Sequence, residues 1–162
     1  MTLPRTPAQT VGPYYEIGLC RRPENELAER SDPGAVQLIG QLLDGEDLPI
    51  GDGLVEIWDP AGRRWGRSST DADGRFSFVV TKPEAQPGDA RRFDVWVHAR
   101  GLLRQQLTRI HFPDEVAANA ADPVLSTLDD ADRATLVAEA EDGALRFDIR
   151  MQGERATVFF AH

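Results

Sequence analysis

Few side chains in this sequence could bind a metal ion. The histidines are His98, His111 and His162, and they are too widely spaced for the compact His-x-His or His-x-x-x-His pair that brings two imidazoles to one ion. The two tyrosines, Tyr14 and Tyr15, are adjacent, and adjacent residues of an extended segment point to opposite sides, so they cannot easily form one two-tyrosinate site. By itself, the sequence predicts a chain that does not build a complete iron or zinc centre.

Nucleophilic and nucleotide chemistry have little support. A catalytic triad needs Ser or Cys next to His with a carboxylate behind it, but the single cysteine, Cys20, lies among Pro and Arg residues, and no Gly-x-Ser-x-Gly motif occurs. A single cysteine also excludes an internal disulfide. The glycines are scattered at turns instead of forming a phosphate-binding loop. The residues therefore support neither a nucleophilic triad nor nucleotide binding.

Arginine is the remaining group that could recognise a ligand. Lys82 is the one lysine among 18 basic residues, so the other 17 are Arg. The guanidinium group pairs well with carboxylates, which allows anion recognition. A GC-rich coding sequence would produce the same bias, and composition alone leaves both explanations open.

Short runs of β-type residues, separated by turn residues, position these groups from residue 35 onward. The predicted strands cover residues 36–43, 53–58, 75–78, 93–100, 106–112, 135–141 and 144–151, and residues 157–160 would close the sheet system. Asp-Gly turns precede the third strand and join the last two as a hairpin. Residues 122–134 contain candidate helix caps and predict one or two short helices. The spacing predicts a mainly β fold, with a single β-sandwich domain over residues 36–162.

Residues 1–35 have a different character. Their prolines and glycines exclude a regular helix or a central strand and predict an extended N-terminal arm. Its apolar residues are more than a disordered tail would carry; they are Val11, Tyr14, Tyr15, Ile17 and Leu19. We expect the arm to pack on its own core or on a partner.

Length and composition exclude several classes of protein. The 162 residues suit one domain, with 41% hydrophobic and 28% charged residues. No stretch approaches the length of a membrane span, and the first residues lack a secretory leader, so we expect a cytoplasmic protein that does not bind membranes. The formal net charge of −9 would repel phosphate backbones, which makes nucleic acid an unsuitable partner.

Several motifs form a specific set through their order and spacing. They occupy residues 10–15, 53–60, 70–76, 99–103, 107–112, 147–154 and 158–160. With these motifs the chain resembles, over most of its length, the alpha subunits of protocatechuate 3,4-dioxygenases in the intradiol ring-cleaving dioxygenase family. The resemblance implies cleavage of protocatechuate with O2 to 3-carboxy-cis,cis-muconate.

The resemblance also implies where the metal is held. Catalytic chains of the family bind a ferric ion through two tyrosinates and the two histidines of a His-x-His strand. By spacing, the comparable strand here places Arg92 and Asp94 where those histidines would be, and the segments that would supply tyrosines, residues 60–69 and 82–90, contain none. The implied arrangement is a chain without metal ligands, with Fe3+ on a homologous beta subunit and αβ units assembled into a higher oligomer.

The same resemblance implies that the arm lines the iron pocket of the beta subunit. There Thr10 would bond to substrate or water, Gly12 would allow close backbone approach, and Pro13 would form an apolar wall. Tyr14 is the candidate catalytic residue, offering a phenolic hydrogen bond near the ligands of the iron. Arg109 would face the pocket and neutralise the ring carboxylate of the substrate, although it could equally be a solvated strand arginine.

Two other functions stay open. The chain could be a purely structural β-sandwich subunit required only for oligomer assembly, and deletion of residues 1–15 would separate this function from a role in the pocket. A carbohydrate-binding module would need a surface platform of aromatic rings, for which Trp58, Trp65 and Trp96 are the candidates. We expect the two strand tryptophans, Trp58 and Trp96, to pack in the core or against a partner.

Overall fold

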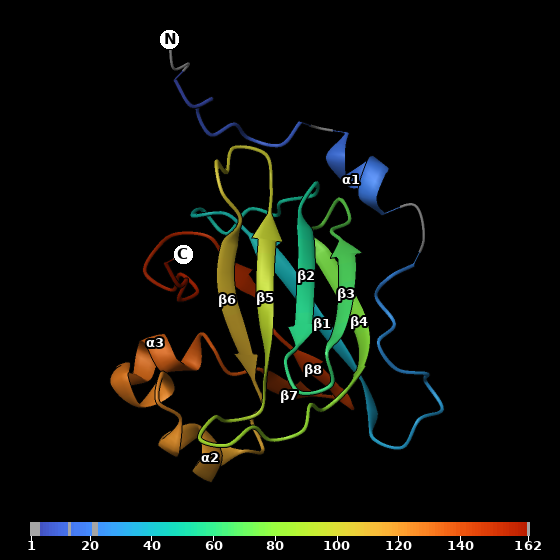
Figure 1. The fold of residues 1–162 in the computed structure, drawn as a ribbon, viewed down its shortest axis with the longest axis vertical. Helices are drawn as coiled ribbons and strands as arrows, with labels where there is room; N and C mark the ends of the chain where they lie inside the picture. The colour runs from blue at the N-terminus through green and yellow to red at the C-terminus, as the bar shows by residue number, and fades with distance from the viewer. Residues whose placement is uncertain (1–3, 13, 21–22, 162) are drawn as a thin grey trace.

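Two β-sheets form the body of the protein (Figure 1). The computed structural model describes residues 4–12, 14–20 and 23–161. One sheet is antiparallel with the order β3-β2-β5-β6, and its strands are β2 (Leu54–Asp59), β3 (Arg64–Ser69), β5 (Arg92–His98) and β6 (Gln106–His111). The other has the order β4-β1-β8-β7, with β9 also paired to β1. Its strands are β1 (Ala35–Leu43), β4 (Arg75–Thr81), β7 (Glu139–Glu141), β8 (Ala144–Arg146) and β9 (Ile149–Arg150).

The core lies between the two sheets. Alternate residues of the longer strands β1, β2, β4, β5 and β6 point into it, and its fully buried members include Leu38, Val55, Phe78, Val95 and Ile110. The facing sheet covers each of these side chains. The hydrophobic effect of this burial is the main contribution to the stability of the sandwich. The predicted mainly β sandwich is confirmed.

Strand β3 was not expected, because its residues do not alternate between apolar and polar. Its pairing with β2 begins at a tight connection where Asp59, which is fully buried, accepts hydrogen bonds from the backbone N–H groups of Ala61 and Gly62. Arg64 closes the connection with an ion pair to Asp59 at 2.8 Å. A buried carboxylate with this many donors is well satisfied, so the hairpin forms without an apolar pattern.

The strand predicted over residues 144–151 is divided into β8 and β9. The backbone N–H of Phe147 donates to Ile39, and the Asp148 carboxylate accepts from Gln41 N at 3.1 Å, which replaces a backbone partner. A Cβ at Gly40 would lie 1.9 Å from the Phe147 carbonyl oxygen, so only glycine allows this approach. The expected hairpin is confirmed by the antiparallel pair β7 and β8.

The C-terminal prediction was wrong. Residues 157–160 form no strand and contribute one isolated bridge, in which Phe160 N donates to Leu107 O at 2.8 Å. Thr157 and Val158 bind elsewhere: Thr157 N donates to Arg150 O, and Val158 O accepts from Thr108. The segment is held by separate contacts to two strands instead of a continuous ladder.

Short helices follow β6 at its lower end in Figure 1. A 3-10 turn, η1 (Leu125–Thr127), and helix α3 (Asp130–Ala134) confirm the helices predicted within residues 122–134, whereas α2 (Val116–Ala121) was not predicted. The Asp129 carboxylate caps α3 by accepting from Asp132 N at 2.8 Å. Among the described residues, no helix is long and apolar enough to cross a bilayer.

A short helix, α1 (Tyr15–Leu19), lies in the described part of the N-terminal arm and corrects the expectation that residues 1–35 contain no regular helix. The helix fits between prolines, since none lies within its five residues. Further on, Glu24 bridges to β3 and Glu26 to β4, while Leu27 packs against the core. This part of the arm therefore lies along the edge shared by the two sheets.

His111 is a buried polar group in this fold. Its side chain is fully buried, and both ring nitrogens have no hydrogen-bond partner among the described residues. Burial lowers the pKa of His111 from 6.5 to about 4, against a smaller opposing effect of Asp122. The imidazole is therefore neutral in the folded protein at neutral pH.

We predict that acid weakens the fold through His111. Because the unfolded state binds a proton at about pH 6.5 and the folded state only near pH 4, stability is fully present above pH 6.5 and falls as pH falls. Between pH 6.5 and 5 the free energy of unfolding should drop by about 2 kcal/mol, measured by urea denaturation. His111→Leu should remove most of this slope, and equal slopes in both proteins would contradict the prediction.

Candidate functional site

The sheet formed by β3, β2, β5 and β6 has one face turned away from the core. We call it the outer face, and its side chains are Glu56, Trp58, Trp65, Arg67, Arg92, Asp94, Trp96, His98, Leu107 and Arg109. These residues alternate with the buried ones, so the pattern that builds the core also selects them. The outer face combines ion pairs at one end with aromatic rings beside them.

An ion-pair network lies where β5 and β6 meet. Asp94 and Arg109 are direct neighbours across the two strands, and Asp94 Oδ1 lies 3.4 Å from Arg109 Nε. The same oxygen lies 3.1 Å from Arg92 Nε, and Arg92 also binds Asp89 at 2.7 Å. The Arg109 guanidinium carbon lies over the Phe160 ring, 4.9 Å from the ring centre. Asp94 therefore holds two arginines in fixed positions.

These residues do not fit a ferric ion. Arg92 and Asp94 lie on the strand that corresponds by spacing to the His-x-His strand of catalytic chains. A metal cation at this place would be repelled by two guanidinium groups, those of Arg92 and Arg109. In the part of the chain that the structure describes, no group of three or more His, Cys, Asp or Glu side chains is arranged to hold a metal.

The aromatic part of the outer face surrounds a shallow cavity of about 350 Å³. All three tryptophans line it, together with Glu56, His98 and Gln105. Glu56 binds Arg67 at 2.6 Å and lies 3.4 Å from His98 Nε2, and the contact with His98 contributes most to lowering the pKa of Glu56. Trp58 and Trp96 are therefore on a surface and not in the core.

The arm residues singled out by the sequence lie at the end of the sandwich that carries the loop between β5 and β6. Thr10 Oγ1 accepts a hydrogen bond from Gly101 N at 2.7 Å. Gly12 is exposed, and Tyr14 is 77% exposed at the start of α1. Pro13 lies outside the described residues. Thr10, Gly12 and Tyr14 are thus near one another in the sequence of the arm, and the Tyr14 side chain is exposed to solvent.

Arg109 stands apart from this group. Its contacts are with β5 and Phe160, whereas Thr10 binds the loop between β5 and β6. The structure of this chain alone does not bring Arg109 into contact with the arm residues it describes.

Sequence reasoning missed Tyr15. Its hydroxyl lies 2.7 Å from Asp52 O and 2.8 Å from His98 O, two acceptors from distant parts of the chain. Burial, with a smaller effect of Asp52, raises the pKa of Tyr15 above its ordinary value. The opposite orientation of adjacent residues indicates that one of Tyr14 and Tyr15 turns inward, but not which one.

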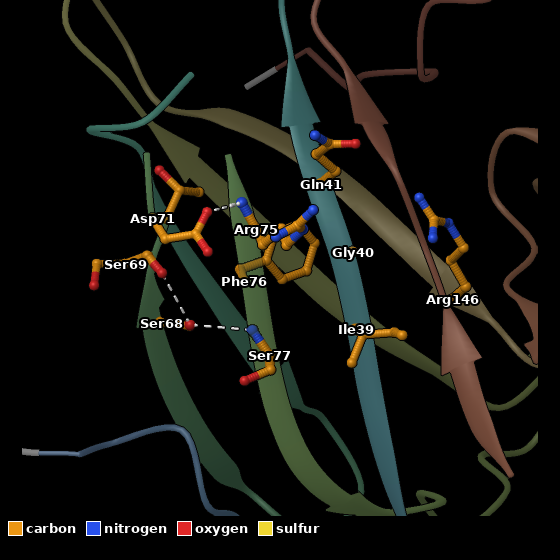
Figure 2. A pocket seen from close by; sticks show the side chains of 11 residues that line it. Ile39, Gly40, Gln41, Ser68, Ser69, Asp71, Arg75, Phe76, Ser77 and Arg146 are labelled. Carbon is orange, nitrogen blue, oxygen red and sulfur yellow. Dashed lines mark hydrogen bonds between the residues drawn. The ribbon is translucent and has the colours of Figure 1, made fainter. Parts of the chain in front are cut away.

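A second cavity, of about 440 Å³, contains none of the predicted site residues (Figure 2). It lies over β1, β3, β4 and β8, where the Ser68 hydroxyl accepts from Ser77 N. Its two arginines are already paired, Arg75 with Asp73 at 2.9 Å and Arg146 with Asp148 at 3.1 Å.

Solved structures share this fold. The dioxygenase domain of a dioxygenase and carbohydrate-binding protein fusion from Streptomyces sp. SirexAA-E has a TM-score of 0.65 at 24% identity, covering 91% of this chain and 98% of that one. An intradiol ring-cleavage dioxygenase from Tetranychus urticae has a TM-score of 0.63 at 15% identity, covering 91% and 93%. No protein-family model matches the sequence. The fold is that of the intradiol dioxygenases.

Curated relatives define the family more narrowly. The protocatechuate 3,4-dioxygenase alpha chain of Burkholderia cepacia is 39% identical, covering 98% of this chain and 98% of the relative. The alpha chain of the same enzyme from Pseudomonas putida is 36% identical, covering 98% and 96%. The chain belongs to the family of protocatechuate 3,4-dioxygenase alpha chains, as the sequence motifs indicated.

We predict that Asp94 stabilises the outer face. Asp94→Asn removes the charge shared by Arg92 and Arg109, whose side chains are 11% and 24% exposed, and leaves them facing each other. The free energy of unfolding should fall by about 2 kcal/mol in urea denaturation. Asp73→Asn is the matched control, because the Asp73 and Arg75 side chains are 63% and 67% exposed, and it should change stability by less than about 0.5 kcal/mol. Equal effects of the two variants would contradict a stabilising network.

Proposed function

We propose that this chain is the non-iron-binding alpha subunit of a ferric intradiol dioxygenase. The enzyme cleaves protocatechuate with O2 to 3-carboxy-cis,cis-muconate, and a homologous beta subunit carries the Fe3+. The alpha chain lines the active site that the beta subunit holds, and the two form αβ units within a larger oligomer in the cytoplasm.

One observation carries the assignment of the metal to the partner. The positions on β5 that would supply imidazoles hold Arg92 and Asp94, and Asp94 forms ion pairs with both Arg92 and Arg109. Histidines at these two positions would remove three ion pairs, which are Arg92 with Asp89, Arg92 with Asp94 and Arg109 with Asp94. The local structure is therefore stabilised by ion pairs and not by metal binding. The names of the two curated relatives support protocatechuate as the substrate and an alpha chain as the type of subunit.

The exposure of the arm supports its role beside the partner. Tyr14 presents a phenol that its own chain does not bury, and Gly12 offers backbone without a side chain in the way. The Thr10 hydroxyl accepts a hydrogen bond from Gly101 N, and its own proton is directed to Val11 O over a long distance of 3.4 Å. Because this second bond is weak, the hydroxyl can still donate to substrate or water. Pro13 would complete this surface with an apolar ring.

Arg109 can contribute a cation to the same site. Its described ion pair uses Nε, which leaves donors at the two Nη atoms for the ring carboxylate of the substrate. Asp94 and Phe160 would hold the guanidinium in place while it binds. The iron, when bound by the partner, supplies the activation of the catecholate toward O2; this chain shapes the pocket and balances charge.

We predict that iron content and activity depend on the partner. The chain expressed alone should contain no stoichiometric iron and show no ring cleavage, because its residues do not fit the metal. Coexpression with the beta chain should give both, measured by metal analysis and by oxygen uptake with protocatechuate. Tight, stoichiometric iron in the isolated chain would overturn the proposal.

We predict that Arg109 and Tyr14 affect catalysis in the complex. Arg109→Ala should raise KM for protocatechuate about 10-fold or more, because one charged hydrogen bond to the substrate is lost. Tyr14→Phe should lower turnover. Steady-state oxygen uptake measures both.

Arg30→Ala and Cys20→Ser are the controls. Arg30 is exposed and pairs only with its neighbour Glu26 among described contacts, and neither variant should change KM or turnover. Deletion of residues 1–15 should leave assembly intact while activity falls. Unchanged kinetics in all variants and in the deletion would favour the alternative, a subunit needed only for assembly.

A further inference from the structure

Among the described residues 4–12 and 14–20, several hydrogen bonds fasten the first part of the arm to its own sandwich. Thr10 accepts a hydrogen bond from Gly101, the Tyr15 hydroxyl reaches the carbonyl oxygens of Asp52 and His98, and Arg67 donates to Leu19 O at 3.3 Å. The second of these joins an arm side chain to two distant parts of the sandwich at once. Figure 1 shows the arm passing across the ends of the strands here.

The Tyr15 hydroxyl is suited to act as a clamp. It has a single proton and faces two carbonyl oxygens at 2.7 and 2.8 Å, so one accepts the hydrogen bond at any moment and the other stands ready to replace it. Half-burial raises the pKa of Tyr15, and the phenol keeps its proton at neutral pH. An ionised phenolate would face only acceptors, which makes this tyrosine a donor and a poor anionic ligand.

The seat of the clamp is itself held together. Asp52 precedes β2, while His98 ends β5 and is followed by Arg100 and Gly101. Arg100 forms an ion pair with Asp52 that joins the two loops. Tyr15 therefore binds both segments that this ion pair joins, and Thr10 binds the loop that follows β5.

Between these two anchors, Gly12 and Tyr14 are exposed. No atom lies within 4 Å of the place where a Cβ would stand on Gly12, and Tyr14 is 77% exposed. Ile17, two residues after Tyr15, is 63% exposed. The backbone is fixed at Thr10 and Tyr15, while the side chain of Tyr14 is presented outward.

We propose that Tyr15 is a positioning residue, whose hydroxyl fixes the arm on its own sandwich before the partner binds, so that residues 10–14 are presented in place. This inference rests on the proposed function, in which those residues line the site of the homologous beta chain. An arm ordered in advance loses less conformational entropy on association than a free one. Tyr15 acts through Thr10, Gly12 and Tyr14 and does not touch the substrate.

Hydrogen exchange of the full-length chain tests the clamp directly. Tyr15→Phe keeps the ring and removes the hydroxyl, and it should raise the exchange of the α1 amides of Gly18 and Cys20 about fivefold, as expected for one lost hydrogen bond. The matched control is Thr108→Val, which removes another hydroxyl that donates to a carbonyl, Val158 O at 2.8 Å. It should leave arm exchange unchanged. Equal arm exchange in Tyr15→Phe and the wild-type chain would overturn the inference.

Kinetics of the αβ complex test what the clamp is for. In Tyr15→Phe, association with the beta chain should slow and KM for protocatechuate should rise a few-fold, while kcat changes little because the assembled site keeps all its groups. Faster arm exchange with no change in association or KM would support the clamp while contradicting the place of the arm beside the substrate, which separates the two proposals.

Discussion

The alternation of β5 is the constraint on which the rest of the structure depends. Phe93, Val95 and Val97 point into the core, so Arg92 and Asp94 must point to the outer face. A shift by one residue would bury two charges and expose the core, so the register cannot slip. The same residues that stabilise the sandwich therefore set the direction of every functional side chain on this strand.

Much of the sandwich could be predicted because it follows from this period of two. It identifies the core face of β2, β5 and β6, and it assigns Leu145, Phe147, Ile149 and Met151 to one face, where the structure also finds them packed on the core. The division of that strand could not be predicted, since it depends on a carbonyl meeting a glycine of β1 that is more than a hundred residues away.

Other features escaped the sequence because they depend on contacts between distant segments. Gly66 in β3 is buried under Leu27 of the arm, and a Cβ there would lie 2.2 Å from the Leu27 side chain. No local pattern shows such a contact. For the candidate site, the resemblance placed Arg92 and Asp94 where catalytic chains have histidines and singled out Arg109 separately. Only the pairing of β5 with β6 joins the three around one carboxylate.

The placement of the tryptophans has a spectroscopic consequence. All three lie around one shallow cavity on the outer face, and the buried aromatic side chains of the core are phenylalanines. Indole emission from this protein therefore reports the polarity of a single surface, while the interior contributes almost no signal. Binding of any molecule that covers that surface can therefore be followed, without a label, by a shift in the wavelength of maximum tryptophan emission.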